Sequence, residues 1–169
     1  RQRQMCIRDR AEPFRSLINP DNALFANPDD MENAIRKYCM DTNQPVPETR
    51  GQIVRCIFES LALRYRQVLD DLRGLASQPI ETLHVIGGGS RNELLNQFTA
   101  NAVGIPVVAG PSEATALGNV MMQAMAIGEA ADVPGMRKLI HNSIPLKTYQ
   151  PQNLENWGQA YIHFKNIVS

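Results

Sequence analysis

Three consecutive glycines followed by small polar residues form the segment best suited to chemistry. Gly87, Gly88, Gly89, Ser90 and Asn92 stand between a short apolar run and a segment with helical periodicity. Glycines let backbone N–H groups point into a tight loop, and the N-terminus of a following helix carries about half a positive charge. Phosphate oxygens are favoured in such a place. The alternative is a strained turn that needs glycine for a positive φ angle and binds no ligand.

This loop lacks two common nucleotide-binding motifs. The dinucleotide fingerprint G-x-G-x-x-G requires a glycine where Asn92 stands, and no acidic residue closes the next apolar run, which ends at Ala109. A P-loop requires a lysine directly after its last glycine, and Ser90 follows Gly89 instead. The pattern therefore disfavours a nicotinamide cofactor and excludes a P-loop enzyme.

The segments around the loop predict a βαβ unit. Residues 82–86 and 105–109 are short apolar runs with β-branched residues, which favour strands. Ser90 and Glu93 match a capping box that opens a helix, and Gly104 ends that helix. One helix between two strands implies that the strands are parallel, with a right-handed crossover.

Further helices are predicted on both sides of this unit. Residues 11–27 are expected to form a loop packed on its neighbours, before a helix capped by Asn27 that runs to about Met40. Thr49 is expected to cap a long helix that Gly74 ends and that lies against a sheet or between helices. Its apolar stripe consists of Ile53, Ile57, Leu61, Tyr65, Val68 and Leu72. Later helices are predicted at residues 113–127, with small residues that permit close packing, at 134–141, and around the core-facing Trp157, Tyr161 and Phe164.

The charge balance limits the classes of partner. Seventeen basic and seventeen acidic residues give a formal net charge of zero, so neither nucleic acid nor a membrane surface is an expected partner. No apolar stretch approaches the roughly 20 residues of a spanning helix, and a cytoplasmic protein is expected. Residues 1–10 are rich in arginine and lack any periodicity. We interpret them as non-native, with the native sequence beginning near Ala11 and truncated there.

The remaining reactive side chains have structural interpretations. The three cysteines lack the spacing of a metal site, and Cys39 and Cys56 are expected to be buried thiols rather than a disulfide or redox pair. His84 is expected to be a core histidine. The carboxylates that could suggest a catalytic base are assigned to solvated helix ends and caps; they are Asp29, Asp30, Asp70, Asp71 and Glu113.

Three segments together resemble one enzyme family. ESLALRY at residues 59–65, HVIGGGSRN at 84–92 and EATALGN at 113–119 are similar to the second domain of the FGGY family of carbohydrate kinases. The similarity covers about residues 11–169. Within the family, the three segments and the pair Gly118-Asn119 are most similar to the members that phosphorylate L-rhamnulose.

The resemblance implies a fold class, α/β: part of an actin-like and hexokinase-like (ribonuclease H-like) ATPase domain, helix-rich, with a short parallel βαβ unit. It implies Mg²⁺ and ATP, a ketose sugar as phosphoryl acceptor, and a missing N-terminal kinase domain as the partner of this chain. The backbone of Gly87, Gly88 and Gly89 is then expected at the phosphates and ribose, and Asn92 at the adenine edge or the sugar. Ser90 is expected among the nucleotide-binding residues. The aspartate base of the family is expected outside this chain, which alone is expected to be inactive.

Two other functions stay open at this point. The chain could belong to an FGGY kinase for another sugar, as in xylulokinases or gluconokinases, because the sugar pocket is expected outside it. It could also be a non-catalytic nucleotide-binding module on the same scaffold. A freestanding small α/β protein is disfavoured, because two strands and five helices leave sheet edges and helix faces uncovered.

Overall fold

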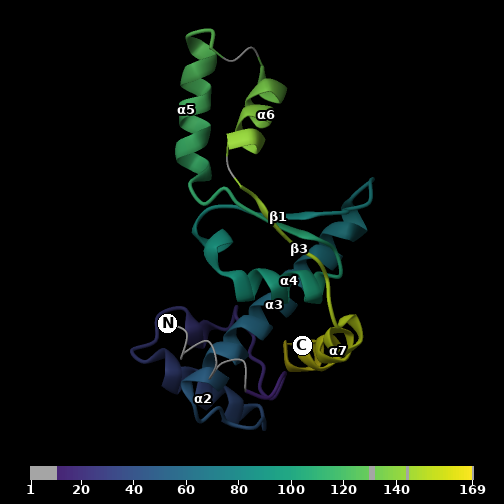
Figure 1. The fold of residues 1–169 in the computed structure, drawn as a ribbon. Coiled ribbons are helices and arrows are strands. Elements are labelled where there is room, and N and C mark those ends of the chain that lie inside the picture. The colour runs from purple at the N-terminus through teal and green to yellow at the C-terminus, as the bar shows by residue number, and fades with distance from the viewer. Residues whose placement is uncertain (1–10, 130–131, 144, 169) are drawn as a thin grey trace.

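A small sheet crosses the middle of the protein, and most of the helices are packed on one side of it (Figure 1). The computed structural model describes residues 11–129, 132–143 and 145–168; the segment interpreted as non-native, residues 1–10, lies outside them. The elements in chain order are the 3-10 turn η1 (Ala23–Phe25), α2 (Met31–Asp41), α3 (Arg50–Leu75), β1 (Leu83–Val85), the 3-10 turn η2 (Gly88–Arg91), α4 (Glu93–Val103), β2 (Val107–Ala109), α5 (Ala114–Ala126), α6 (Val133–Ser143), β3 (Lys147–Tyr149) and α7 (Leu154–Val168).

The sheet has the strand order β1-β2-β3. Strands β1 and β2 are parallel, with Leu83 opposite Val107, and α4 connects them, so the predicted βαβ unit is confirmed. Strand β3 pairs with β2 in the antiparallel direction, with Tyr149 opposite Val107. This third strand was not predicted, because three residues of which two are polar give no readable alternation.

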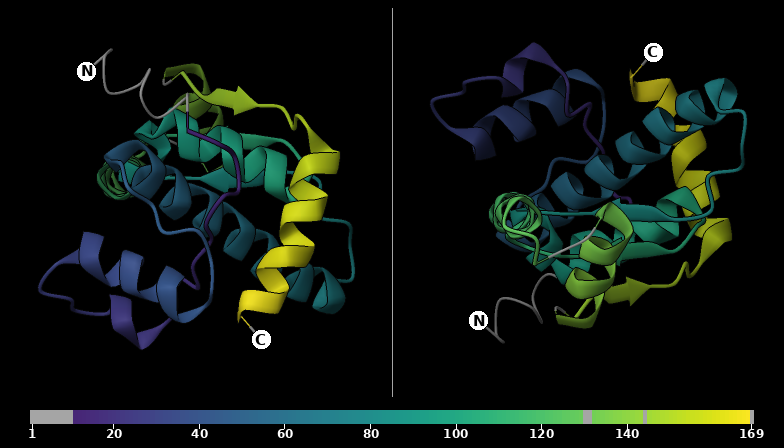
Figure 2. Two further views of the ribbon diagram at one scale, coloured as in Figure 1. Left: turned by 90° about the horizontal axis from the view of Figure 1, so that it is seen from below. Right: turned by 90° about the horizontal axis from the view of Figure 1, so that it is seen from above.

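Helices α3, α4 and α7 form the main core beside the sheet. Leu63 of α3, Phe98 of α4 and Phe164 of α7 are buried in one cluster, and the Trp157 ring packs against Phe98 with 5.3 Å between ring centroids. Figure 2 shows α7 lying beside α3 and α4. The predicted core-facing stripe of α7 is therefore confirmed, as is the position of α3 between helices.

The segment before α2 is a packed loop, as predicted. Leu17 and Ile18 are buried, and the Gln44 side chain accepts a hydrogen bond from Leu17 N (2.8 Å) and donates one to Leu17 O (2.7 Å). The predicted cap of α2 is wrong, because Asp30 rather than Asn27 accepts the hydrogen bond from Asn33 N (3.0 Å). An extended backbone at Asp30 places its carboxylate over the first helical turn, which satisfies an amide that would otherwise lack a partner.

The C-terminal half of α3 departs from the predicted apolar stripe. Thr49 caps the helix as predicted, but Tyr65, Val68 and Leu72 are 41–50% exposed. They face a groove between α3 and β1 rather than a covered core. His84, predicted to be buried, is exposed in β1. Both errors have one cause: these residues line one groove that no described strand or helix fills.

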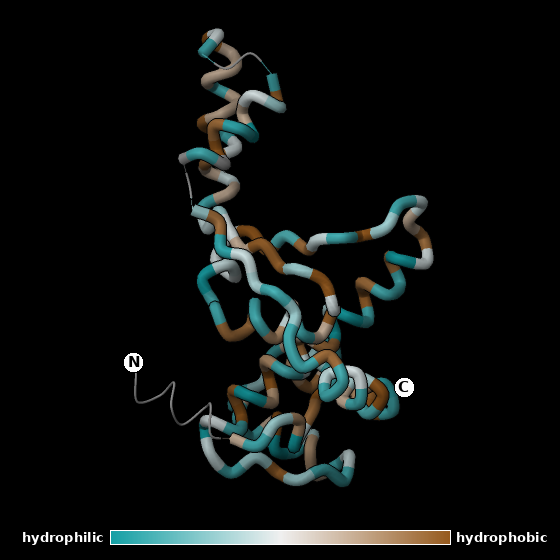
Figure 3. Tube along the Cα trace, turned by 45° about the vertical axis from the view of Figure 1, so that its right-hand side comes forward, coloured by the Kyte–Doolittle hydropathy of each residue, from teal (hydrophilic) through white to brown (hydrophobic). Residues whose placement is uncertain are grey.

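Helices α5 and α6 project away from the packed body (Figure 1). Hydrophobic residues recur along this projection in Figure 3, and Val120, Met122 and Ile127 are more than half exposed. The close packing predicted for the small residues of α5 is not seen, since a Cβ at Gly118 would meet no heavy atom of the described residues within 4 Å. Among these residues, no helix is both long and apolar enough to cross a membrane.

Replacing Phe164 tests the packing of α7. The side chain is fully buried, so Phe164→Ala should lower the free energy of unfolding by about 3–5 kcal/mol. The matched control is Ile162→Ala on the exposed side of α7, where the loss should stay within about 0.5 kcal/mol. Urea denaturation followed by circular dichroism measures both. Equal losses would contradict the docking of α7 on α3 and α4.

Candidate nucleotide-binding site

Two loops meet at the edge of the sheet where β1 and β2 end. Because the strands are parallel, their carboxyl ends lie at the same edge, which is where α/β sheets commonly bind ligands. Gly110 N donates to Val85 O (2.8 Å), and Gly87 N donates to Pro111 O (2.9 Å). These two bonds fasten the glycine loop after β1 to the loop after β2.

Glycine stands at the three positions of the loop for different structural reasons. Gly87 has φ 75°, a left-handed conformation that favours glycine. Gly88 and Gly89 have no positive φ. A Cβ added at Gly88 would meet no described heavy atom within 4 Å, and a Cβ added at Gly89 would meet only the Val85 side chain, at 3.8 Å. The fold itself therefore has room for side chains at Gly88 and Gly89. Glycine at both positions is consistent with close approach of a ligand to the backbone.

Ser90 and Glu93 do not form the predicted capping box. The Ser90 hydroxyl donates to Gly87 O (2.7 Å), and Asn92 is the N-cap of α4, with its Oδ1 accepting from Leu95 N (3.2 Å). The reason is the 3-10 turn η2, which occupies residues 88–91 and moves the start of α4 beyond Ser90. Capping uses Asn92 Oδ1 and leaves Asn92 Nδ2 available. Among the described residues, no acceptor is found for this nitrogen.

A buried side chain of α4, which was not predicted from the sequence, holds the loop by a hydrogen bond to its backbone. Asn96 is 1% exposed, and its Nδ2 donates to Ser90 O (2.9 Å). Asn96 lies one helical turn after Asn92, on the face of α4 that points to the core. A polar residue within an apolar helical face was the available signal, because a buried amide needs a partner.

The charged side chains near the loop are paired with each other. Arg91 Nη2 lies 2.6 Å from Glu113 Oε1 and 3.1 Å from Ser112 Oγ, so it links the two loops. Lys147 Nζ lies 2.7 Å from Glu93 Oε1, and this hydrogen bond raises the pKa of Lys147. With both cations paired, the positive potential of the loop comes mainly from backbone amides and the N-terminus of α4. Glu113 thus has an ion-pair partner, in keeping with the structural assignment of this carboxylate.

Two of the other carboxylates that could suggest a catalytic base, Asp30 and Asp70, also have structural partners. Asp30 caps α2, and Asp70 lies 3.0 Å from Arg73. Cys39 and Cys56 are buried as predicted, and both thiols are free. Within the described ranges, no group of three His, Cys, Asp or Glu residues is arranged to hold a metal ion.

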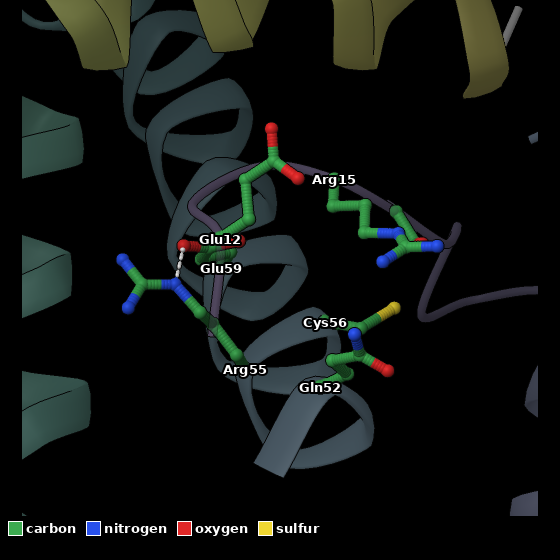
Figure 4. Close-up of a pocket in the computed structure, with 7 residues that line it drawn as sticks. Glu12, Arg15, Gln52, Arg55, Cys56 and Glu59 are labelled. Atoms are coloured by element: carbon green, nitrogen blue, oxygen red, sulfur yellow. Dashed lines mark hydrogen bonds and ion pairs between the residues drawn. The ribbon is translucent and has the colours of Figure 1, made fainter. Parts of the chain in front are cut away.

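A buried carboxylate away from the loop was not predicted. Glu59 of α3 is 1% exposed and lies beside Arg55, with 2.6 Å between Glu59 Oε1 and Arg55 Nε, while Phe14 N donates to Glu59 Oε2 (2.8 Å). Figure 4 shows both side chains beside a small cavity that Glu12, Arg15 and Cys56 also line. Burial raises the pKa of Glu59 to about 7 against the opposing effect of Arg55. The carboxylate anchors the N-terminal loop to α3.

A family comparison decides what kind of domain carries this loop. Residues 7–127 match the family described as "FGGY family of carbohydrate kinases, C-terminal domain". The match includes the whole glycine loop and more than half of the chain. The chain belongs to the FGGY family of carbohydrate kinases. The predicted family is thereby confirmed.

Several curated proteins similar to this FGGY chain are described as rhamnulokinases. The rhamnulokinase of Bacteroides thetaiotaomicron is 77% identical over 160 residues, which are 95% of this chain and 33% of that protein. That of Pectobacterium carotovorum is 49% identical over 154 residues, 91% of this chain and 31% of the relative. The chain therefore spans about a third of the length of the curated relatives that it matches.

Two solved structures establish the fold class of the FGGY chain. A glycerol kinase of Plasmodium falciparum, solved with ADP, has a TM-score of 0.66 at 15% identity and covers 99% of this chain and 33% of its own. A xylulose kinase of Rhodospirillum rubrum has a TM-score of 0.54 at 20% identity over 73% of this chain and 25% of its own. The predicted class, part of an actin-like ATPase domain, is confirmed, with a small mixed sheet in place of the purely parallel pair.

The buried Glu59 predicts a pH dependence of stability. Its pKa is about 7 in the folded chain and has an ordinary value of 4.5, so between these values the folded state retains a proton that the unfolded state has released. The contribution of protonated Glu59 to the free energy of unfolding is therefore fully present below about pH 4.5. It is lost as the pH rises towards about 7. From about pH 5 to about pH 8, the wild type should lose up to about 3 kcal/mol relative to Glu59→Gln. Urea denaturation across that range measures the difference, and parallel curves for the two proteins would contradict the assignment.

Proposed function

We propose that the chain is the ATP-binding part of a carbohydrate kinase that transfers the γ-phosphoryl group of ATP to O1 of L-rhamnulose. The observation that carries the nucleotide site is the loop Gly87–Gly89, where two glycines are not required by the fold and lie at the carboxyl edge of parallel strands. The relatives described as rhamnulokinases support the choice of acceptor. Residues 11–169 form the C-terminal domain of this kinase in the proposal.

Each site residue has a role that its geometry permits. The amides of Gly88 and Gly89 open the turn η2, where the first donors of a helical turn lack partners within it, and they bind phosphate oxygens. Ser90 shapes the turn through its hydrogen bond to Gly87 O. Asn92 presents its Nδ2 to the adenine edge or the sugar while its Oδ1 caps α4. Gly87 supplies the left-handed turn that orients the next two amides.

The reaction is an in-line displacement at the γ-phosphorus. The sugar hydroxyl oxygen forms the new bond, the bond to the bridging oxygen of ADP breaks, and a carboxylate accepts the hydroxyl proton. Mg²⁺ enters with the nucleotide and neutralises charge on its phosphates. The part of this protein outside the chain, an N-terminal domain, contributes the aspartate base and the sugar pocket. The 169-residue chain alone is then expected to lack kinase activity.

Calorimetric titration of MgATP into the full-length protein tests the nucleotide site. Gly88→Val fills the open space above the loop and should weaken binding at least about tenfold, or about 1.4 kcal/mol. Asn92→Ser keeps a capping oxygen but removes the amide, and it should also weaken binding. Gly158→Val on α7 is the matched control, since that glycine also has open space but lies away from the loop. Unchanged affinity in both loop variants would mean that the glycine loop is only a turn.

The acceptor is tested separately with the full-length protein. Phosphorylation of L-rhamnulose should exceed that of D-xylulose by at least about tenfold in kcat/KM, because a pocket built for one sugar leaves polar groups unpaired with the other. A coupled assay for ADP formation measures both. A preference for D-xylulose would replace the proposed acceptor and leave the nucleotide site intact. ATP binding without transfer to either sugar would favour a non-catalytic module.

A further inference from the structure

Two anchored residues flank Gly88 and Gly89 in the glycine loop. Gly87 N donates to Pro111 O (2.9 Å), and Ser90 N donates back to Gly87 O (3.1 Å). Among the described residues, no acceptor is found for the amides of Gly88 and Gly89, and neither residue has a side chain that could hold it in place. The directions of these two amides therefore depend on how firmly Gly87 and Ser90 are fixed.

The carbonyl group of Ser90 is held by a side chain rather than by the backbone of the helix that follows. Asn96 Nδ2 donates to Ser90 O (2.9 Å), and no backbone N–H of the described residues is found to donate to that oxygen. In an uninterrupted α-helix, the amide four residues further along the chain would do so. Helix α4 begins only at Glu93, so the Asn96 side chain takes the place of the missing helical bond.

Burial makes this side-chain bond costly to break. Asn96 is 1% exposed, and its neighbours Thr99 and Ala100 on α4 are buried as well. A buried amide that loses its partner is unfavourable, because no water replaces the lost hydrogen bond. Ser90 therefore cannot move away from α4 without leaving the Asn96 amide unpaired. The hydroxyl of Ser90 has no comparable effect, since its bond to Gly87 O lies within the turn and does not reach the core.

We propose that Asn96 is a positioning residue for the nucleotide. It does not touch ATP, but it holds Ser90 so that the amides of Gly88 and Gly89 are directed to the phosphates before the nucleotide arrives. This inference rests on the proposed function of the glycine loop. A loop that is ordered in advance binds more tightly, because its freedom is not lost at the moment of binding.

The positioning role has a characteristic kinetic signature. Without the Asn96 amide, the Kd for MgATP and the KM for ATP should each rise at least about tenfold. The KM for L-rhamnulose should change by less than about twofold, because in the proposed function the sugar pocket lies outside this chain. A substitution that only destabilised the domain would leave both KM values of the folded protein unchanged.

Calorimetric titration of MgATP and steady-state kinetics of the full-length protein test the proposal. Asn96→Leu keeps a similar volume, removes the amide and should show the expected increases in Kd and KM for ATP. The matched control is Asn101→Leu, because Asn101 is also a buried asparagine of α4 (6% exposed). Its Oδ1 accepts from Gln97 Nε2 (2.8 Å) and Gln152 N (2.9 Å), so it has no bond to the glycine loop.

Asn101→Leu should lower the free energy of unfolding and change the Kd for MgATP by less than about twofold. Urea denaturation of both variants compares their losses of stability. An unchanged Kd in Asn96→Leu would overturn the proposal. Equal increases of Kd in the two variants would also overturn it, because the effect would then follow from a weakened α4 rather than from the loop.

Hydrogen exchange in the unsubstituted full-length protein gives a test that does not depend on the folding of a variant. NMR follows the exchange of side-chain amide protons with water in the absence of nucleotide. The Nδ2 protons of Asn96 should exchange at least about 100-fold more slowly than those of Asn92, whose Nδ2 has no acceptor among the described residues. Equal exchange at the two side chains would show that Asn96 does not hold Ser90, and the proposal would be wrong.

Comparison with Gly88→Val separates this inference from the proposed function. Weaker MgATP binding in Gly88→Val together with normal binding in Asn96→Leu would remove the positioning role and leave the nucleotide site in place. Normal binding in both variants would contradict the nucleotide site itself, and the positioning role with it.

Discussion

Backbone hydrogen bonds at both ends of the strand pair hold β1 beside β2, and the candidate site depends on them. The bonds from Leu83 N, Gly87 N and Gly110 N fix the parallel pair at both ends. They bring the glycine loop and the loop after β2 to one edge, although about twenty residues separate the two loops in sequence. The turn at Gly87, with its positive φ, is then the point where the chain leaves the sheet and presents the next two amides.

Helix α4 transmits this arrangement to the core. Asn92 caps the N-terminus of α4, and the buried Asn96 holds Ser90. Gly104 ends the helix in a left-handed conformation (φ 72°), which lets the chain return into β2. The apolar side of α4 packs against α3 and α7. Helix α3 therefore has two different halves: the first is buried against α2 and the N-terminal loop, and the second borders the open groove beside β1.

The sequence predicted the elements that have strong local signals. The 3.6-residue period of α3 and α7, the stop at Gly104 and the apolar runs of β1 and β2 identified the βαβ unit and the helices. The predicted stop at Gly74 is wrong, because α3 continues through it to Leu75. It failed where the outcome depends on what covers a surface. His84 and Tyr65 are in apolar patterns yet are exposed, because burial of a face requires a partner that no local pattern encodes. The capping box at Ser90 failed for another reason, since a 3-10 turn competes with the start of α4. The family resemblance, rather than periodicity, supplied the expected ligand for the loop.

In the proposed site, the amides of Gly88 and Gly89 contact the phosphates of the nucleotide. The most direct test is an NMR titration of the full-length protein, labelled with ¹⁵N at glycine, with Mg-ADP. The amide signals of Gly88 and Gly89 should shift and saturate with a single dissociation constant, while the signal of Gly158 on α7 should stay in place. Signals of Gly88 and Gly89 that do not move at saturating nucleotide would contradict it.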